Sequence, residues 1–127
     1  MLELTPEQFV EESDYSWLSV RNHLVHLMST DNRWLARVRG DELPDRLEPI
    51  DYPDQDAVRQ KWDEVRDRVF AYITGLTTED LHEIIEVDLP HRGGTYPNRR
   101  WEILLHMVNH GTDHRAQILA RLHELGA

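Results

Sequence analysis

The sequence predicts an all-α protein, and three long amphipathic segments are the main evidence for this. In each segment, apolar residues recur three or four positions apart, which places them on one face of a helix. A polar residue suited to cap a helix precedes each segment, and a glycine follows it. The chain has 127 residues, the size of one domain, so we expect a single helical domain over residues 1–127.

The predicted helices can be placed in order along the chain. A short helical turn is expected after Thr5 and Pro6, and another near residues 78–82. The long helices are predicted over three ranges, 19–39, 54–74 and 99–125. Their expected caps and stops are, in the same order, Ser16 or Ser19 with Gly40, Asp54 with Gly75, and Asn98 with Gly126.

Two long links separate these helices. Residues 41–53 carry three prolines, and residues 83–97 carry two prolines and the pair Gly93 and Gly94. Residues 84–87 in the second link are predicted to form a short strand. Long links in a small helical domain are typical of crossovers between parallel neighbours, or of loops at the mouth of a site.

The composition argues against several classes of partner. Acidic residues outnumber basic ones 24 to 14, and the net charge of −10 lacks the basic surface that nucleic acid or an anionic membrane requires. The chain has no cysteine, which removes disulfides, thiolate ligands and a cysteine nucleophile. The sequence shows no signal peptide and no apolar run near the ~20 residues of a membrane span. We therefore expect a cytoplasmic protein.

The most informative local pattern is a pair of histidines four residues apart, His110 and His114. Residues at this spacing lie one turn apart on a helix, so two imidazoles can bind one metal ion. A helical wheel places both beside the apolar face and His106 nearly opposite it, on the expected surface. Two partly buried, hydrogen-bonded histidines without a metal explain the pair equally well.

A catalytic site of the zinc type usually has three protein ligands, and the first long helix offers two candidates for the third. His23 lies about 60° from the centre of the apolar face of that helix, and His26 about 120°. Periodicity therefore favours His23. An offset residue such as His26 also reaches a site between neighbouring helices.

Two motifs resemble the DinB/YfiT-like family of helical metalloproteins. The first motif has His26, an acidic Asp31 five positions on and Trp34 three further, and the second spans residues 109–118. They occur together at the appropriate spacing, and the match covers nearly the whole chain. The resemblance implies a four-helix bundle that holds a divalent metal ion, commonly nickel, zinc or iron, through His26, His110 and His114.

This sequence departs from the family pattern at two places. Ala116 stands where the family usually has glycine, which a helix tolerates. Relatives usually have a full helix before the segment 5–8, where this sequence has only residues 1–4, so the first helix is expected to be missing or very short. An apolar groove would then be uncovered, and we expect a homodimer to cover it.

The resemblance also implies a class of chemistry. Some relatives transfer a low-molecular-weight thiol, such as mycothiol or bacillithiol, to an electrophile. The implied function is a metal-dependent enzyme with a small-molecule substrate, either a thiol-dependent S-transferase or a hydrolase. The alternatives are a non-enzymatic metal-binding or stress-response protein with a vestigial site, and a structural helical dimer with core histidines.

Several other residues carry expectations. Asp31 and Arg115 are each placed about 20° from the centre of an apolar face, so they are expected to pair with each other or with other residues of the bundle. A basic cluster is expected to be a solvated loop more than a site for a substrate carboxylate: His91, Arg92, Arg99 and Arg100. Three tryptophans are predicted in the core, namely Trp34, Trp62 and Trp101, and two histidines on the surface, namely His82 and His123.

Overall fold

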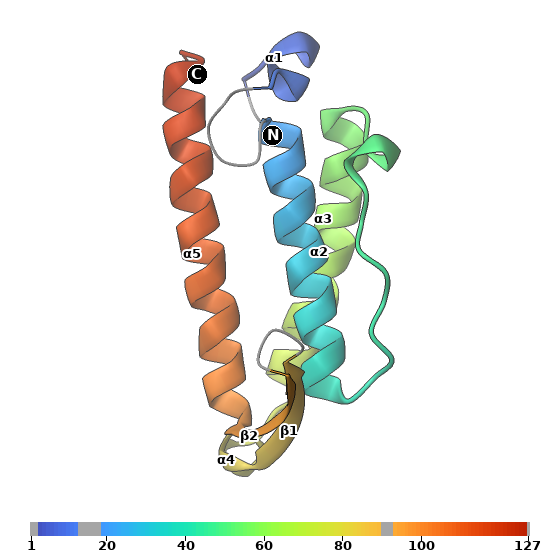
Figure 1. Cartoon of the computed structure of the whole chain (residues 1–127), viewed down its shortest axis with the longest axis vertical. Coiled ribbons are helices and arrows are strands. Elements are labelled where there is room, and N and C mark those ends of the chain that lie inside the picture. The colour runs from blue at the N-terminus through green and yellow to red at the C-terminus, as the bar shows by residue number, and fades with distance from the viewer. Residues whose placement is uncertain (1–2, 13–18, 90–92, 127) are drawn as a thin grey trace.

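The computed structural model describes residues 3–12, 19–89 and 93–126, and helices account for 68% of the structure. This confirms the predicted all-α class. The long helices are α2 (Val20–Arg39), α3 (Gln55–Thr74) and α5 (Arg100–Glu124), each within one residue of its predicted bounds (Figure 1). The short ones are α1 (Pro6–Val10), α4 (Thr78–His82) and the 3-10 turn η1 (Pro49–Asp51).

The helix ends follow from local hydrogen bonds. The Ser19 hydroxyl accepts from the Asn22 N–H at 3.0 Å, and the Asp54 carboxylate accepts from the Ala57 N–H at 2.9 Å, so both predicted caps are confirmed. Gly40 ends α2 in the left-handed conformation, with φ of 75°. The predicted alternative cap Ser16 lies outside the described residues.

The predicted cap of α5 is wrong. Arg99, the last residue of a strand, takes the cap position, and its N–H donates to the Glu102 carboxylate at 3.0 Å, while Asn98 lies one residue earlier in that strand. That strand, β2 (Gly94–Arg99), pairs antiparallel with β1 (Ile84–Leu89). The expected strand at residues 84–87 is thus confirmed, and its partner lies in a stretch that carried no strand prediction. The hairpin lies at one end of the bundle (Figure 1).

Helix α2 is the centre of the fold. It contacts both α3 and α5, and it runs antiparallel to α5 (Figure 1). One buried cluster lies along the N-terminal half of α2 and includes Phe9 from α1, Val58 from α3 and Ile118 from α5. A second lies along its C-terminal half and includes Val87 from β1 and Ile103 from α5. The two clusters hold α2 and α5 at a fixed height relative to each other.

The buried face of α5 differs from the predicted one. The residues that the structure buries are Ile103, Met107, Gly111, His114 and Ile118. Helical periodicity also predicts Trp101, Val108 and Leu119 in the apolar stripe of this helix, but they are exposed, with exposed fractions of 41%, 58% and 66%. The cause is that α5 packs against α2, so the flank that carries Val108 borders a groove instead of a neighbouring helix.

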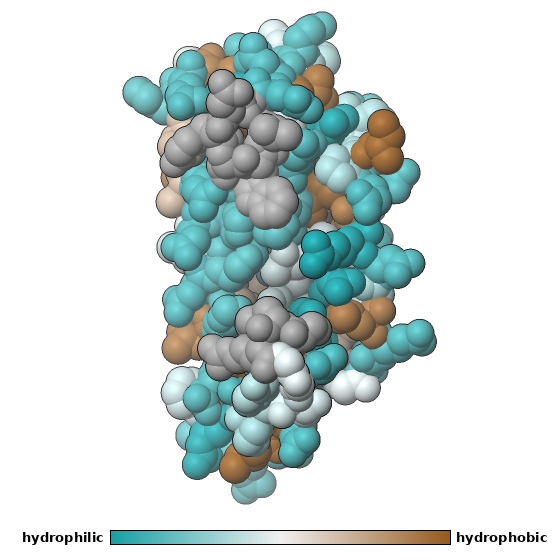
Figure 2. Space-filling view, in the orientation of Figure 1, coloured by the Kyte–Doolittle hydropathy of each residue, from teal (hydrophilic) through white to brown (hydrophobic). Residues whose placement is uncertain are grey.

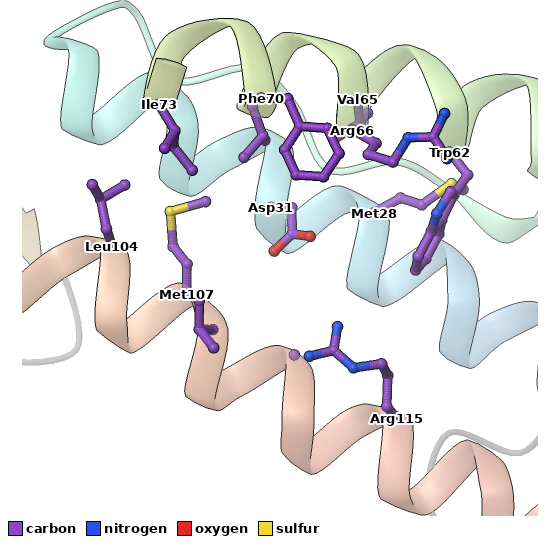
Figure 3. Close-up of a pocket in the computed structure, with 13 residues that line it drawn as sticks. Met28, Asp31, Trp62, Val65, Arg66, Phe70, Ile73, Leu104, Met107 and Arg115 are labelled. Carbon is purple, nitrogen blue, oxygen red and sulfur yellow. The ribbon is translucent and has the colours of Figure 1, made fainter. Parts of the chain in front are cut away.

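That groove lies between α3 and α5, with α2 as its floor, and has a volume of about 320 Å³ (Figure 3). Its wall on α3 is formed by residues such as Trp62, which is half-buried, and Phe70 and Ile73, which are 58% and 42% exposed. Helical periodicity in residues 54–74 predicts Ile73 in the core, and the groove explains why it is exposed. Trp34 is buried as predicted, in the second core cluster.

Asp31 projects into the groove from α2, and Arg115 approaches it from α5 (Figure 3). Burial raises the pKa of Asp31 to about 6, and the positive charge of Arg115 offsets part of that rise. The expected ion pair is not among those formed by the described residues. Arg115 is exposed, contrary to prediction, and its guanidinium lies over Gly111, where a Cβ would come within 3.1 Å of Nη1.

Two members of the predicted basic cluster connect α5 to the segment before the hairpin. The Arg99 guanidinium donates to the His82 carbonyl at 3.0 Å, and the Arg100 guanidinium donates to the Glu83 carboxylate at 3.0 Å. Their role is therefore structural, which corrects the expectation of a solvated loop. The other two members, His91 and Arg92, lie outside the described residues.

The surface agrees with the acidic composition. The face shown in Figure 2 is mostly hydrophilic, and its hydrophobic residues lie in small, separate patches. Within the described ranges, no helix has the length and apolar character needed to cross a membrane.

Candidate metal centre

Four histidines meet between α2 and α5. Because the two helices are antiparallel, His23 and His26, one turn apart on α2, face His114 and His110, one turn apart on α5. The ring centroids of His110 and His114 are 4.3 Å apart, and those of His26 and His114 are 4.6 Å apart. The sequence pattern HxxxH on α5 thus contributes two rings to one point, and α2 supplies the others.

Three of these residues form a group that could hold a metal ion. His26, His110 and His114 each offer a ring nitrogen within 4.8 Å of the others. The Nε2 atoms of His110 and His114 are 3.1 Å apart. Two nitrogens bound to one metal ion at about 2.1 Å lie roughly 3.0–3.4 Å apart in octahedral or tetrahedral geometry. The distance between the two Nε2 atoms on α5 therefore fits metal coordination without any movement of the helix backbone.

His23 occupies a different place. Its Nε2 lies 2.8 Å from Nδ1 of His114, on the opposite edge of that ring from the nitrogen that faces His110. His23 is also the more buried of the two histidines on α2, as the wheel predicted. Burial alone did not identify the side chain that faces the pair on α5, and the structure brings His26 there, as the family register implied.

The electrostatics favour neutral imidazoles. Burial lowers the pKa of His23 and of His26 to about 4, and the neighbouring His114 lowers both further. Burial is also the main reason why the pKa values of His110 and His114 are lowered. At neutral pH each ring is therefore unprotonated at one nitrogen, and that lone pair is what a divalent metal requires.

The other three histidines that the structure describes are exposed, as the sequence predicts. His106 is exposed and packs edge-on against Trp34, with ring centroids 4.8 Å apart. Its ring centroid lies 6.4 Å from that of His110, on the same side of α5. His82 and His123 are exposed, as predicted.

Arginines beside the site were not predicted. Arg33 and Arg37 continue the face of α2 that carries His26, at helical spacing, and Arg37 lies 4.8 Å over the ring of Trp34. The positive charge of Arg46, in the link after α2, contributes to the lowered pKa of His26. The helical spacing of Arg33 and Arg37 from His26 could have predicted that they share its face of α2. The position of Arg46 depends on the path of the link and could not be predicted in this way.

The fold and these contacts define a helical-bundle protein with a three-histidine candidate metal site between two antiparallel helices. The sequence model of the DinB family matches residues 1–127, so the chain belongs to the DinB family. It is also similar to Protein DinB of Bacillus subtilis (strain 168), with 28% identity over 129 residues. That alignment covers 98% of this chain and 74% of the relative.

Proposed function

We propose that this protein binds one divalent metal ion through His26, His110 and His114. With that metal bound, we propose that it is an enzyme that acts on a small-molecule substrate. The convergence of the three ring nitrogens is the observation that carries the proposal. Nitrogen ligands of this kind suit nickel, zinc or iron, and we propose one of these three as the metal.

The three side chains would leave the metal open to substrate. Imidazoles are neutral ligands, so they do not reduce the charge of the ion, and three ligands leave at least one coordination position free. A bound divalent metal supplies Lewis acidity, which lowers the pKa of a coordinated water or thiol. The proposed reactions are therefore transfer of a low-molecular-weight thiol to an electrophile, or hydrolysis.

The surroundings of the site support a small anionic substrate. The positive charge of Arg46 acts on His26, and Arg37 is close enough to Arg33 and Arg46 for their charges to lower its pKa, in a protein whose net charge is −10. A thiol cosubstrate that carries a carboxylate matches this charge, and it would supply the nucleophile that a chain without cysteine lacks. We propose the cytoplasm as the location, because thiols stay reduced there.

Metal binding is tested first, on protein purified without a histidine tag. We expect His114→Ala to weaken zinc or nickel binding at least about 100-fold, since one of three ligands carries several kcal/mol of a binding free energy on the order of 10 kcal/mol. His106→Ala is the matched control, because it removes an exposed histidine from the same helix. Competition with a chromophoric chelator measures both affinities. Equal losses in the two variants would contradict the ligand assignment.

Catalysis is tested on the metal-loaded protein. Turnover of a generic aryl electrophile with a panel of low-molecular-weight thiols, and of activated esters without a thiol, distinguishes transfer from hydrolysis. We expect activity in one assay and its loss in His114→Ala. A protein that binds metal tightly and catalyses neither reaction would support a non-enzymatic metal-binding role instead.

A further inference from the structure

We propose that His23 is a positioning residue that holds the His114 ring in the orientation and tautomer needed for metal binding. The inference rests on the proposed metal site and adds a residue to it. His23 is not a ligand in this arrangement, and it would act through His114 alone.

The geometry around His114 carries the proposal. One edge of the ring, at Nδ1, lies 2.8 Å from Nε2 of His23, and the other, at Nε2, lies 3.1 Å from Nε2 of His110. The two nitrogens of an imidazole point in divergent directions. A metal ion bound at Nε2 of His114 therefore cannot also be bound by His23, which lies at Nδ1 on the other edge of the ring. His23 therefore lies behind the ligand, where ligand-orienting partners are found in metal sites.

The contact between the two rings is also compatible with the tautomer of His114 that binds a metal. A neutral imidazole carries its proton on one nitrogen, and the nitrogen that binds a metal must be unprotonated. With a metal at Nε2 of His114, the proton resides on Nδ1, and that N–H donates to Nε2 of His23. His23 must then carry its own proton on Nδ1. The pair of rings thus leaves the lone pair of His114 directed at His26 and His110.

Burial makes this contact effective. His23 is 3% exposed and His114 is 9% exposed, so water does not compete freely for the bond between them. His110 provides the contrast, since its Nδ1 is buried and forms no hydrogen bond among the described residues. Among the described residues, Nδ1 of His114 thus has a side-chain partner on α2, and Nδ1 of His110 does not.

The tautomer can be read directly in the metal-free protein. Long-range ¹H–¹⁵N correlation spectra of the histidine rings report which nitrogen is protonated. We expect His114 to carry its proton on Nδ1 and to have an unprotonated Nε2. A predominant Nε2–H form of His114 would overturn the proposal without the use of any variant.

Three substitutions test the effect on binding. His23→Leu removes the acceptor, and His23→Asn keeps a polar group that is too short to reach His114. We expect both to lose about 10- to 100-fold in Co²⁺ affinity, the range seen when an outer partner of a metal ligand is removed, with altered d–d absorption bands. His23→Gln places an amide oxygen near the position of Nε2, and it should restore the affinity and spectrum of the wild type.

Leu35→Ala is the matched control for a loss of fold stability. Leu35 is a buried residue of α2 in the second core cluster, so the variant destabilises the fold without touching His114. Its Co²⁺ affinity should equal that of the wild type. The proposal fails if His23→Leu and His23→Asn bind Co²⁺ like the wild type, if His23→Gln binds as weakly as they do, or if Leu35→Ala loses as much. A wild type that binds no Co²⁺, zinc or nickel would instead disprove the proposed function.

Discussion

At the scale of single residues, the groove places an acidic side chain where water is scarce. Asp31 is half-buried among apolar residues, and its pKa rises from 3.8 to about 6 for that reason. Above pH 6 the folded protein must therefore hold a poorly solvated carboxylate, which the unfolded chain solvates freely. The ionised side chain destabilises the fold at neutral pH.

Asp31→Asn should stabilise the protein at high pH and not at low pH. The rise in pKa from 3.8 to about 6 corresponds to a gain in unfolding free energy on the order of 3 kcal/mol at pH 8, and the gain should vanish near pH 3, where both states bind the proton. Urea unfolding at the two pH values measures it, with the exposed Asp45→Asn as control. A gain of equal size at both pH values would show that the charge of Asp31 is not responsible.

The histidines give the opposite dependence on pH in the metal-free protein. The pKa values of His23 and His26 fall from 6.5 in the unfolded chain to about 4 in the fold. Between these values the unfolded state binds more protons, so the free energy of unfolding decreases as the pH is lowered from 6.5 to 4. His110 and His114 contribute with the same sign, and Asp31 offsets part of the effect.

A comparison with His26→Gln isolates this contribution, since the other groups are common to both proteins. We expect the unfolding temperature of chelator-treated wild-type protein to decrease more than that of His26→Gln as the pH falls from 7 to 4.5. Differential scanning calorimetry measures the two series. Parallel curves would mean that His26 has an ordinary pKa in the fold.

At the scale of the elements, helix α2 ends where its sequence requires it to end. Gly40 has φ of 75°, and a Cβ built there meets no atom within 4 Å, so the cost of a side chain is one of backbone conformation alone. Gly40→Ala should lower the unfolding free energy by about 1 kcal/mol. Gly75→Ala, at the end of α3, should leave it unchanged or raise it, because Gly75 has φ of −84° and ordinary contacts. Urea unfolding decides, and equal effects of the two substitutions would contradict the expectation.

The helices also show which features periodicity predicts and which it does not. Hydrogen bonds within a helix and at its caps depend on nearby residues, which is why the bounds of α2, α3 and α5 were predicted to within one residue. The rotation of α5 about its axis depends on which neighbours cover it. Periodicity predicts an apolar stripe with Leu104 at its centre, but the structure centres the buried face nearer Met107 and His114, because α3 does not close over the flank of Val108.

At the scale of the whole molecule, the open groove is the feature that calls for a partner. Phe70 on one wall and Val108 on the other are each 58% exposed, and a hollow of about 320 Å³ lies between the walls. Projecting apolar side chains and an adjacent apolar hollow on one surface are what a two-fold, self-complementary contact requires. We therefore propose a second copy of the chain as the cover, in a homodimer.

Sedimentation equilibrium at micromolar concentration tests the dimer. The wild type should have twice the mass of the chain, and Val108→Lys should be a monomer that keeps its helical circular dichroism. Ile50→Lys is the control, since Ile50 is 80% exposed in the link before α3 and does not line the groove. A monomeric wild type, or a dimer that Val108→Lys leaves intact, would contradict a dimer formed through the groove.

That residues 1–127 form a single domain stays a prediction.

The helical class, the helix bounds, most of the caps and the candidate ligands on α5 could be predicted from the sequence alone. Each of these depends on spacing along one helix or on hydrogen bonds between residues a few positions apart. The choice between His23 and His26 came from the resemblance to a family, because periodicity ranked them by burial and so favoured His23. Burial and metal coordination are separate properties of a side chain, and no helical wheel distinguishes them.

The features that depend on the relative position of α2 and α5 became visible in the folded structure. Their antiparallel packing brings His26 to the pair on α5 and puts His23 behind His114. It also turns the apolar flank of α5 toward an open groove between α3 and α5. These outcomes are set by contacts between residues about 90 positions apart, and the pattern of one helix carries no information on the rotation or height of its neighbour.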